Sequence, residues 1–113
     1  MKKMLFAAVL VLPVTAFAET IPAQDAPGHW GEAATVVGRA SVQRMASGEI
    51  YLDLEGRGDG APVSAYVSRW NAGLFLDAAN LDGKVIAISG DISGYRGRPE
   101  IALSNPSQIE ILN

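Results

Sequence analysis

The residues best suited to bind a ligand lie in one short stretch near the C-terminus. Tyr95, Arg96 and Arg98 stand close together, with Gly94 before them and Gly97 between the two arginines. Arginine and tyrosine side chains bind phosphates, carboxylates and planar rings. Glycine lets the backbone bend and approach a ligand closely. The stretch therefore predicts a compact cationic tip that can hold an anionic or ring-containing ligand.

Two further tyrosines lie on neighbouring segments with alternating apolar residues. If Glu55 faces Pro62 across the hairpin that joins these segments, Tyr51 faces Tyr66 on the outer side. Bases that stack on such aromatic rings contribute roughly 1–3 kcal/mol each. The alternative stays open, because a cross-strand pair of tyrosines also stabilises a sheet without binding anything.

Arginines complete the predicted binding surface. Arg44 ends the first predicted strand and Arg39 lies on the outer face of the same strand. We expect Arg44, Arg96 and Arg98 to concentrate positive charge at one rim. In the alternative interpretation, Arg96 and Arg98 form solvated ion pairs with acids such as Glu100, each of which contributes little to stability.

Residues suited to catalysis or metal binding are few. His29, the single histidine, lies beside Trp30 in a segment without periodicity, where we expect it to be exposed to solvent. Asp53 and Glu55 alternate on one exposed strand face, and two carboxylates do not make a dedicated cation site. The glycines of 56–60 lack the helix and lysine of a phosphate-binding loop. We therefore expect no enzymatic activity, no bound metal and no cofactor.

The elements that must position these residues follow from the alternation of apolar side chains. Gly38 interrupts the first alternating run, which indicates a bulge or sharp bend where one strand serves both halves of a small barrel. The predicted strands lie at about 36–43, 50–55, 63–68, 86–93 and 101–111, with a break at Asn105-Pro106-Ser107 in the last.

A short helix is predicted within 69–82, between the third and fourth strands. Leu74, Phe75 and either Ala78 or Ala79 form its apolar stripe. Trp70 and Phe75 are expected to pack this helix against the sheet. Three strands, a short helix and two strands are the layout of the OB-fold, an all-β, five-stranded barrel.

The local motifs of the C-terminal half carry a family resemblance. The run Leu81-Asp82-Gly83-Lys84-Val85-Ile86-Ala87-Ile88-Ser89-Gly90, followed by Tyr95-Arg96-Gly97-Arg98-Pro99-Glu100-Ile101 and Pro106-Ser107-Gln108-Ile109, resembles OB-fold domains of the nucleic-acid-binding class. The resemblance covers roughly 33–112 and extends to stand-alone secreted OB-fold proteins of bacteria. It implies a ligand site across the second and third strands, flanked by the loops after the first and fourth strands, and single-stranded DNA or RNA as ligand.

The first 18 residues predict a cleaved secretory signal peptide. Lys2 and Lys3 precede the apolar stretch Met4–Val14, and Ala16-Phe17-Ala18 matches a small-x-small cleavage pattern. The stretch is shorter than the roughly 20 residues that span a bilayer, which disfavours the alternative of an uncleaved anchor. We expect a periplasmic protein, or one that is fully secreted, without a transmembrane segment in the mature chain. Residues 19–32 would form a flexible lead-in or an arm that covers an edge, and 33–113 the OB-fold domain.

The charge balance leaves two classes of function open. After removal of the two N-terminal lysines, seven cationic side chains stand against 12 acids, a net charge of −5, which disfavours general binding of nucleic acid. The first hypothesis is weak binding of single-stranded nucleic acid without sequence preference, with Tyr51, Tyr66 and Tyr95 stacking on bases. The second is a protein-interaction, small-ligand or oligosaccharide-binding module of the bacterial envelope; in a third, the 19–31 arm docks an accessory subunit onto an envelope partner.

Overall fold

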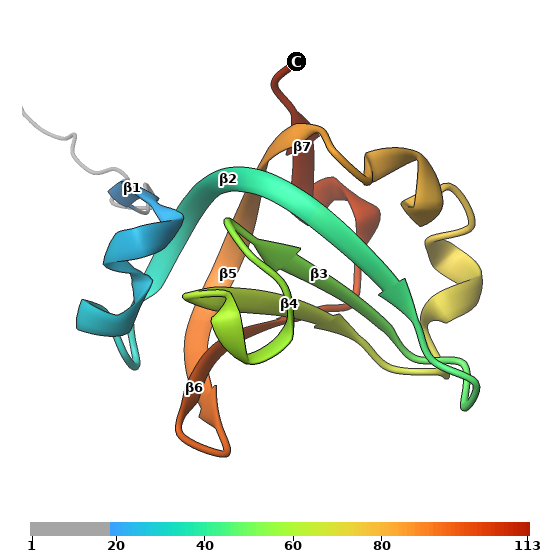
Figure 1. Cartoon of the computed structure of the whole chain (residues 1–113), viewed down its shortest axis with the longest axis horizontal. Helices are drawn as coiled ribbons and strands as arrows, with labels where there is room; N and C mark the ends of the chain where they lie inside the picture. Colours follow the sequence, from blue (N-terminus) through green and yellow to red (C-terminus); the bar gives the residue numbers. More distant parts are fainter. Residues whose placement is uncertain (1–18) are drawn as a thin grey trace, which may run out of the picture.

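The computed structural model describes residues 19–113, with Tyr95 by its backbone only. Within this range seven strands form a sheet, and the central five of them close into a barrel (Figure 1). Around the barrel, β2 pairs with β3, β3 with β4, β4 with β6, β6 with β5, and β5 again with β2. The β4–β6 pairing is parallel and the others are antiparallel. This is the OB-fold topology, and the predicted fold class is confirmed. The strands are β1 (Glu19–Pro22), β2 (Ala33–Arg44), β3 (Ile50–Leu54), β4 (Val63–Val67), β5 (Val85–Tyr95), β6 (Arg98–Leu103) and β7 (Ile109–Ile111).

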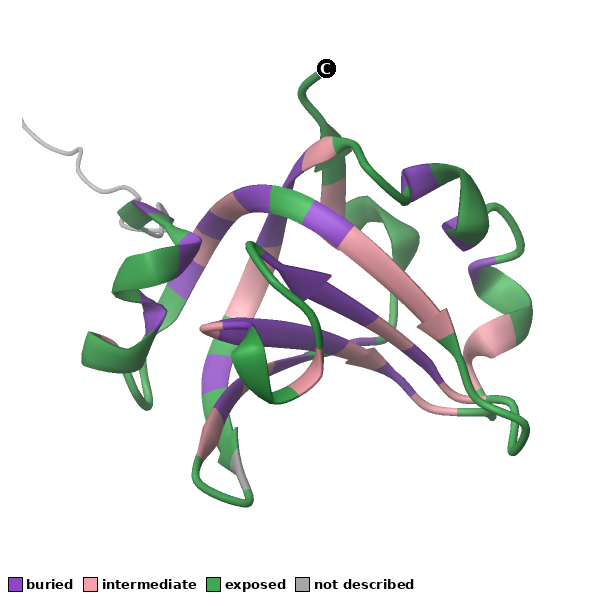
Figure 2. Cartoon of the chain, viewed as in Figure 1, coloured by how far each residue is buried: buried purple, intermediate pink, exposed green. Residues whose placement is uncertain are grey.

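The alternating apolar residues of the barrel strands form one core. Leu52, Ala65, Ile88 and Ile101 are each at most 1% exposed, and Figure 2 shows buried positions recurring along the barrel strands. Side chains of a strand alternate between its two faces, so this burial turns the intervening residues outward.

The long strand β2 changes partner in its middle. Up to Arg39 it pairs with β5, where Gly38 lies opposite Ile86, and from Ala40 onward it pairs with β3. A Cβ atom at Gly38 would lie 3.2 Å from the Cβ atoms of both Ala23 and Leu54. Glycine therefore lets the strand bend while neighbouring elements approach it closely. The predicted role of this glycine, in a strand shared by both halves of the barrel, is confirmed.

The N-terminal segment covers an edge rather than forming a flexible lead-in. Strand β1 runs parallel to the first half of β2, and the 3₁₀ helix η2 (Ala23–Gly28) follows it. Ile21, Ala23 and Ala26 are buried in the core. Of the two alternatives for this segment, the structure shows the edge-covering arm.

The connection from η2 to β2 is tied to β5. The Gly31 amide donates to the Ile92 carbonyl at 2.7 Å, and the Ile92 amide donates to the Glu32 carbonyl at 2.9 Å. The indole of Trp30 lies against Gly94, where an added Cβ would come within 2.0 Å of the ring. Gly94 therefore leaves room for the Trp30 ring, which the sequence pattern did not predict.

The connection between β4 and β5 is helical as predicted but is divided into two short turns. It contains two 3₁₀ turns, η4 (Ala72–Leu74) and η5 (Ala78–Leu81). Gly73 is a poor helix former in the middle of this segment, and burial of Phe75 and Ala78 needs only single turns. Among residues 19–113, the structure contains no helix long and apolar enough to cross a membrane.

Trp70 does not pack against the barrel. Trp70 is 81% exposed, and the Arg69 guanidinium lies 4.6 Å from the centroid of the Trp70 ring. Phe75, in contrast, is 5% exposed. The prediction that both aromatic residues close this end of the barrel is therefore confirmed for Phe75, which belongs to the core, and wrong for Trp70, whose ring lies against the Arg69 guanidinium instead.

Replacing Gly38 by valine tests the bend in β2. The added methyl groups would press on the neighbouring elements, and overpacking of this kind costs about 1–3 kcal/mol. Urea unfolding should show a lower free energy of unfolding for Gly38→Val. Gly73→Ala is the matched control, because an added Cβ there meets nothing within 4 Å. Equal stability of Gly38→Val and the parent protein would contradict this account of the bend.

Candidate functional site

The predicted register places Tyr51 opposite Tyr66, and the structure confirms it. The two ring centroids lie 5.3 Å apart with an interplanar angle of 52°. Both residues are half-buried, and the Tyr66 hydroxyl donates to Glu49 Oε2 at 3.2 Å. Gln43 of β2 lies beside Tyr51 in the register. We call the outward surface around Gln43, Glu49, Tyr51 and Tyr66 the tyrosine face.

The next pair along β3 and β4 is closed to solvent. Asp53 and Ser64 lie opposite each other and are each 2% exposed. The Ser64 hydroxyl donates to Asp53 Oδ1 at 2.6 Å, and the Gly58 amide donates to Asp53 Oδ2 at 2.7 Å. The prediction that Asp53 lies on an exposed strand face is wrong, because the β3–β4 loop with η3 (Gly58–Gly60) folds over it. Its carboxylate therefore has a structural role in holding this loop.

Arg98 is directed at the same loop. Its guanidinium donates to the carbonyl of Gly58, to that of Ala61 at 3.5 Å and to the Ser64 hydroxyl at 3.3 Å. The exposed Asp59 carboxylate lies 3.9 Å away. A ligand that used Arg98, as the sequence analysis predicts, would have to compete with these acceptors.

The other arginines are spread over the molecule. Arg39 donates to the Gly83 carbonyl, and Arg44 donates to the Leu76 carbonyl at 3.3 Å, so both contact the region between β4 and β5. Figure 1 shows the end of β2 and the β5–β6 hairpin on opposite sides of the molecule. The structure therefore does not bring Arg44 and Arg96 to one rim.

The cationic tip that the sequence predicts at the β5–β6 connection is a tight hairpin turn. Tyr95 pairs with Arg98, and the two residues between them, Arg96 and Gly97, have φ angles of 53° and 77°. Positive φ at both central positions is the signature of the hairpin turns that match the twist of the strands. Arg96 is exposed, whereas the predicted stacking role of the Tyr95 side chain lies outside what the structure describes.

An acid lies beside the closed end of this face. Glu100 of β6 is next to Ser64 in the parallel register and is half-buried. Burial raises the pKa of the Glu100 carboxyl, and the charge of Arg98 lowers it by a smaller amount. Glu49 beside Tyr66 and Glu100 beside Ser64 therefore place two acids at the borders of the tyrosine face.

A hollow lies elsewhere on the barrel. It has a volume of about 380 Å³ between the β4–β5 connection and β7, with Leu74, Phe75, Ile109 and Ile111 among its lining residues. No residue of the tyrosine face lines it. The tyrosine face is therefore a separate surface from this hollow.

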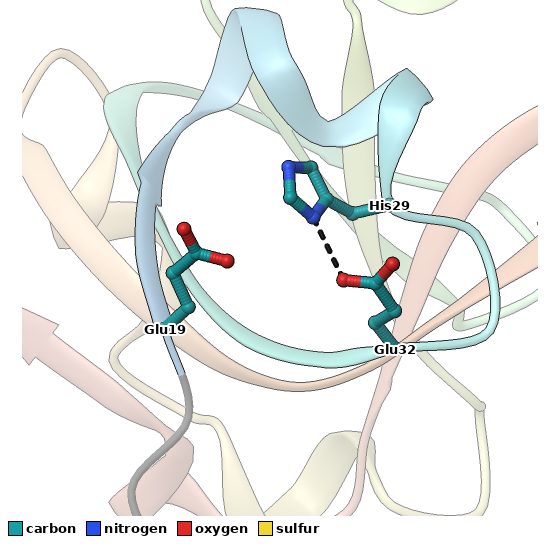
Figure 3. A group of neighbouring side chains, drawn as sticks. All are labelled: Glu19, His29 and Glu32. Atoms are coloured by element: carbon teal, nitrogen blue, oxygen red, sulfur yellow. Dashed lines mark hydrogen bonds and ion pairs between the residues drawn. The ribbon is translucent and has the colours of Figure 1, made fainter.

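A cluster near the N-terminus joins residues that are distant in sequence. His29 Nδ1 lies 2.8 Å from Glu32 Oε1, and Glu19 of β1 lies beside them (Figure 3). The hydrogen bond to Glu32 raises the pKa of His29 most; burial opposes it, and the charges of Glu19 and Asp25 add to it. Sequence reasoning treated His29 as isolated, although its spacing of three residues from Glu32 was a usable signal.

Comparison with known proteins supports the fold and leaves the family open. No protein-family model matches the chain, and no curated protein matches it either. Among solved structures, the chain is similar to OBody AM1L10 bound to hen egg-white lysozyme, with 26% identity, a TM-score of 0.61 and coverage of 89% of this chain and 98% of the OBody. OBody AM3L15, also bound to hen egg-white lysozyme, gives 25% identity, a TM-score of 0.61 and coverage of 88% and 98%.

A similarity to one region of a larger enzyme shows the same fold. The chain matches asparaginyl-tRNA synthetase from Pyrococcus horikoshii with 18% identity and a TM-score of 0.60, over 86% of this chain and 24% of the synthetase. The fold and the surface together define an OB-fold domain that is compatible with a generic binding module.

Replacing Glu100 by glutamine tests the electrostatics beside this face. Because the folded state raises the pKa of this carboxyl, the neutral form of Glu100 is favoured in the folded protein. Its contribution to the free energy of unfolding is fully present below the pKa of the unfolded chain and is lost as the pH rises through the folded pKa. Glu100→Gln removes that loss. We expect the stability of the variant relative to the parent protein to be higher at about pH 7 than at about pH 3.5, which lies below the ordinary pKa of a glutamate.

Urea unfolding at the two pH values provides the measurement. Glu110→Gln is the control, since Glu110 is exposed on β7. A stability difference between Glu100→Gln and the parent that does not change with pH, or that changes in the opposite direction, would refute the assignment.

Proposed function

We propose that this chain is a non-enzymatic binding module of the bacterial envelope, which holds an uncharged oligosaccharide or peptide segment on its tyrosine face. The observation that carries the proposal is the half-buried pair of Tyr51 and Tyr66, 5.3 Å apart, with Glu49 and Gln43 beside it. Flat apolar groups of a ligand can pack on the rings, while its hydroxyl or amide groups bond to the neighbouring polar side chains.

The arginines support an uncharged ligand over a polyanion. Arg39, Arg44 and Arg98 each donate to backbone carbonyls of the protein itself. Binding of a nucleic acid depends on phosphate contacts with cationic side chains. A surface flanked by Glu49 and Glu100 offers little of that attraction.

The similar structures support protein or peptide recognition by such a barrel. The OBodies that match at 25–26% identity are bound to a protein, hen egg-white lysozyme. OB-folds use one face for oligonucleotides and oligosaccharides, so the chemistry of the face has to decide between ligands.

Single-stranded nucleic acid is the second candidate. Paired tyrosines on adjacent strands can stack bases, the exposed Arg96 lies at the tip of the β5–β6 hairpin, and the chain is similar to part of a tRNA synthetase. Such binding would be weak and without sequence preference.

Export to the periplasm is part of the proposal. The predicted signal peptide, residues 1–18, lies outside the described residues. The two lysines, the apolar stretch and the small-x-small pattern of these residues support it. An uncleaved N-terminus or a different cleavage site would alter this part of the proposal without affecting the tyrosine face.

Titration with ligands of different charge distinguishes the two candidates. We expect neutral oligosaccharides or uncharged peptides to shift amide NMR signals of β3 and β4, with an affinity that changes little with salt. Tyr51→Ala and Tyr66→Ala should each weaken binding by roughly 2- to 10-fold, since an aromatic contact contributes about 0.5–1.5 kcal/mol. Tyr66→Phe keeps the ring and serves as the matched variant for folding.

The same titration with single-stranded DNA oligonucleotides tests the second candidate. Binding that falls steeply with salt and drops in Arg96→Ala would favour nucleic acid and overturn the first proposal. Arg96→Ala should leave binding of an uncharged ligand unchanged. Saturable binding of neither ligand class at low salt would refute a ligand role for the tyrosine face.

Expression of the complete sequence in a bacterial host tests export. We expect the periplasmic fraction to contain a protein whose intact mass corresponds to residues 19–113. Ala18→Leu should block this cleavage, because a large residue replaces the small one next to the site. Recovery of the uncleaved chain from the cytoplasm of the parent strain would contradict the proposal.

A further inference from the structure

The cluster at the N-terminal end of the barrel has the composition of a metal site. Within residues 19–113, Glu19, His29 and Glu32 each offer a ligand atom, and these atoms all lie within 4.8 Å of one another. Figure 3 shows the three side chains directed into the same space between β1 and the segment that leads into β2. The cluster lies apart from the tyrosine face, so what it binds is independent of the function proposed there.

The backbone around the cluster is fixed by pairing. Glu19 lies opposite Ala34 in the parallel β1–β2 ladder. The His29 amide donates to the Ala26 carbonyl at 2.9 Å, and the Glu32 amide donates to the His29 carbonyl at 3.2 Å. The three ligand residues therefore come from positions that the fold holds together, while their exposed or half-exposed side chains remain accessible to an ion.

We propose that Glu19, His29 and Glu32 bind a divalent transition-metal ion, with Zn²⁺ as the ion that fits best. One imidazole nitrogen and two carboxylate oxygens form a mixed ligand set, which suits zinc better than the all-oxygen sets of calcium and magnesium. Three protein ligands leave a position for water in tetrahedral coordination.

The geometry requires only side-chain movements. Zinc–ligand bonds of about 2.0–2.2 Å put neighbouring ligand atoms roughly 3.4 Å apart in a tetrahedron. The 2.8 Å contact between His29 Nδ1 and Glu32 Oε1 would open slightly to admit the ion. The exposed Glu19 carboxylate would close on it from within the 4.8 Å limit.

The surroundings favour a cation. The carboxylate of Asp25, in η2, acts on His29 together with those of Glu19 and Glu32, so three carboxylates stand against the single α-amino group that the proposed cleavage would leave on Glu19. The negative potential raises the local concentration of a divalent cation.

Titration of the purified protein with ZnCl₂ tests the site. The preparation carries no histidine tag, because a tag would bind zinc itself. Calorimetry should show one equivalent bound, and NMR should show shifts confined to the His29 ring and to amides near Glu19 and Glu32. Excess Mg²⁺ should not displace the zinc.

Variants of the ligands separate a built site from scattered surface binding. His29→Gln, Glu19→Gln and Glu32→Gln should each weaken zinc binding by at least about tenfold, and amide spectra of the metal-free variants check their folding. Glu110→Gln, on β7, is the matched control and should bind as the parent does. Unchanged stoichiometric binding in His29→Gln, or no saturable binding up to millimolar zinc, would overturn the proposal.

Discussion

The barrel closes through the bend of β2 at Gly38, where one strand passes from pairing with β5 to pairing with β3. A closed barrel needs a strand that belongs to both of its halves, and a Cβ added at this bend would lie only 3.2 Å from the Cβ atoms of Ala23 and Leu54. The first half of β2 then carries β1 and the segment with His29. The second half carries Gln43 to the edge of the tyrosine face. The two candidate sites are therefore separated by the same bend.

Backbone carbonyls of the protein bind three of the six arginines in residues 19–113. Arg98 binds carbonyls of the β3–β4 loop, and Arg39 and Arg44 bind carbonyls before β5 and in the β4–β5 connection. A guanidinium has five N–H donors in a fixed geometry, which suits it to hold irregular loops whose carbonyls have no partner in a sheet. Positive charge counted in the sequence is thus not the same as positive charge offered to a ligand.

Local alternation predicts most of this fold and only part of its surfaces. The inward positions of β3 and β4, such as Leu52 and Ala65, and the facing of Tyr51 and Tyr66 follow from a period of two and one hairpin register. Burial of Asp53 depends on a loop that folds over it, and Trp70 lies exposed against Arg69 while Phe75 is buried. These outcomes are set by tertiary contacts, which periodicity does not contain.

The cluster around His29 could not be predicted from periodicity either. Its members are separated in sequence by the η2 turn, and only the parallel β1–β2 pairing brings Glu19 beside His29 and Glu32. An acidic chain that repels polyanions attracts cations, so the charge balance that disfavours nucleic acid favours an ion here. An ion held by residues of β1 and of the segment before β2 would fasten the N-terminal arm to the barrel. That arm includes Ala23, which packs at the bend of β2, so occupancy of the cluster and closure of the barrel would stabilise each other.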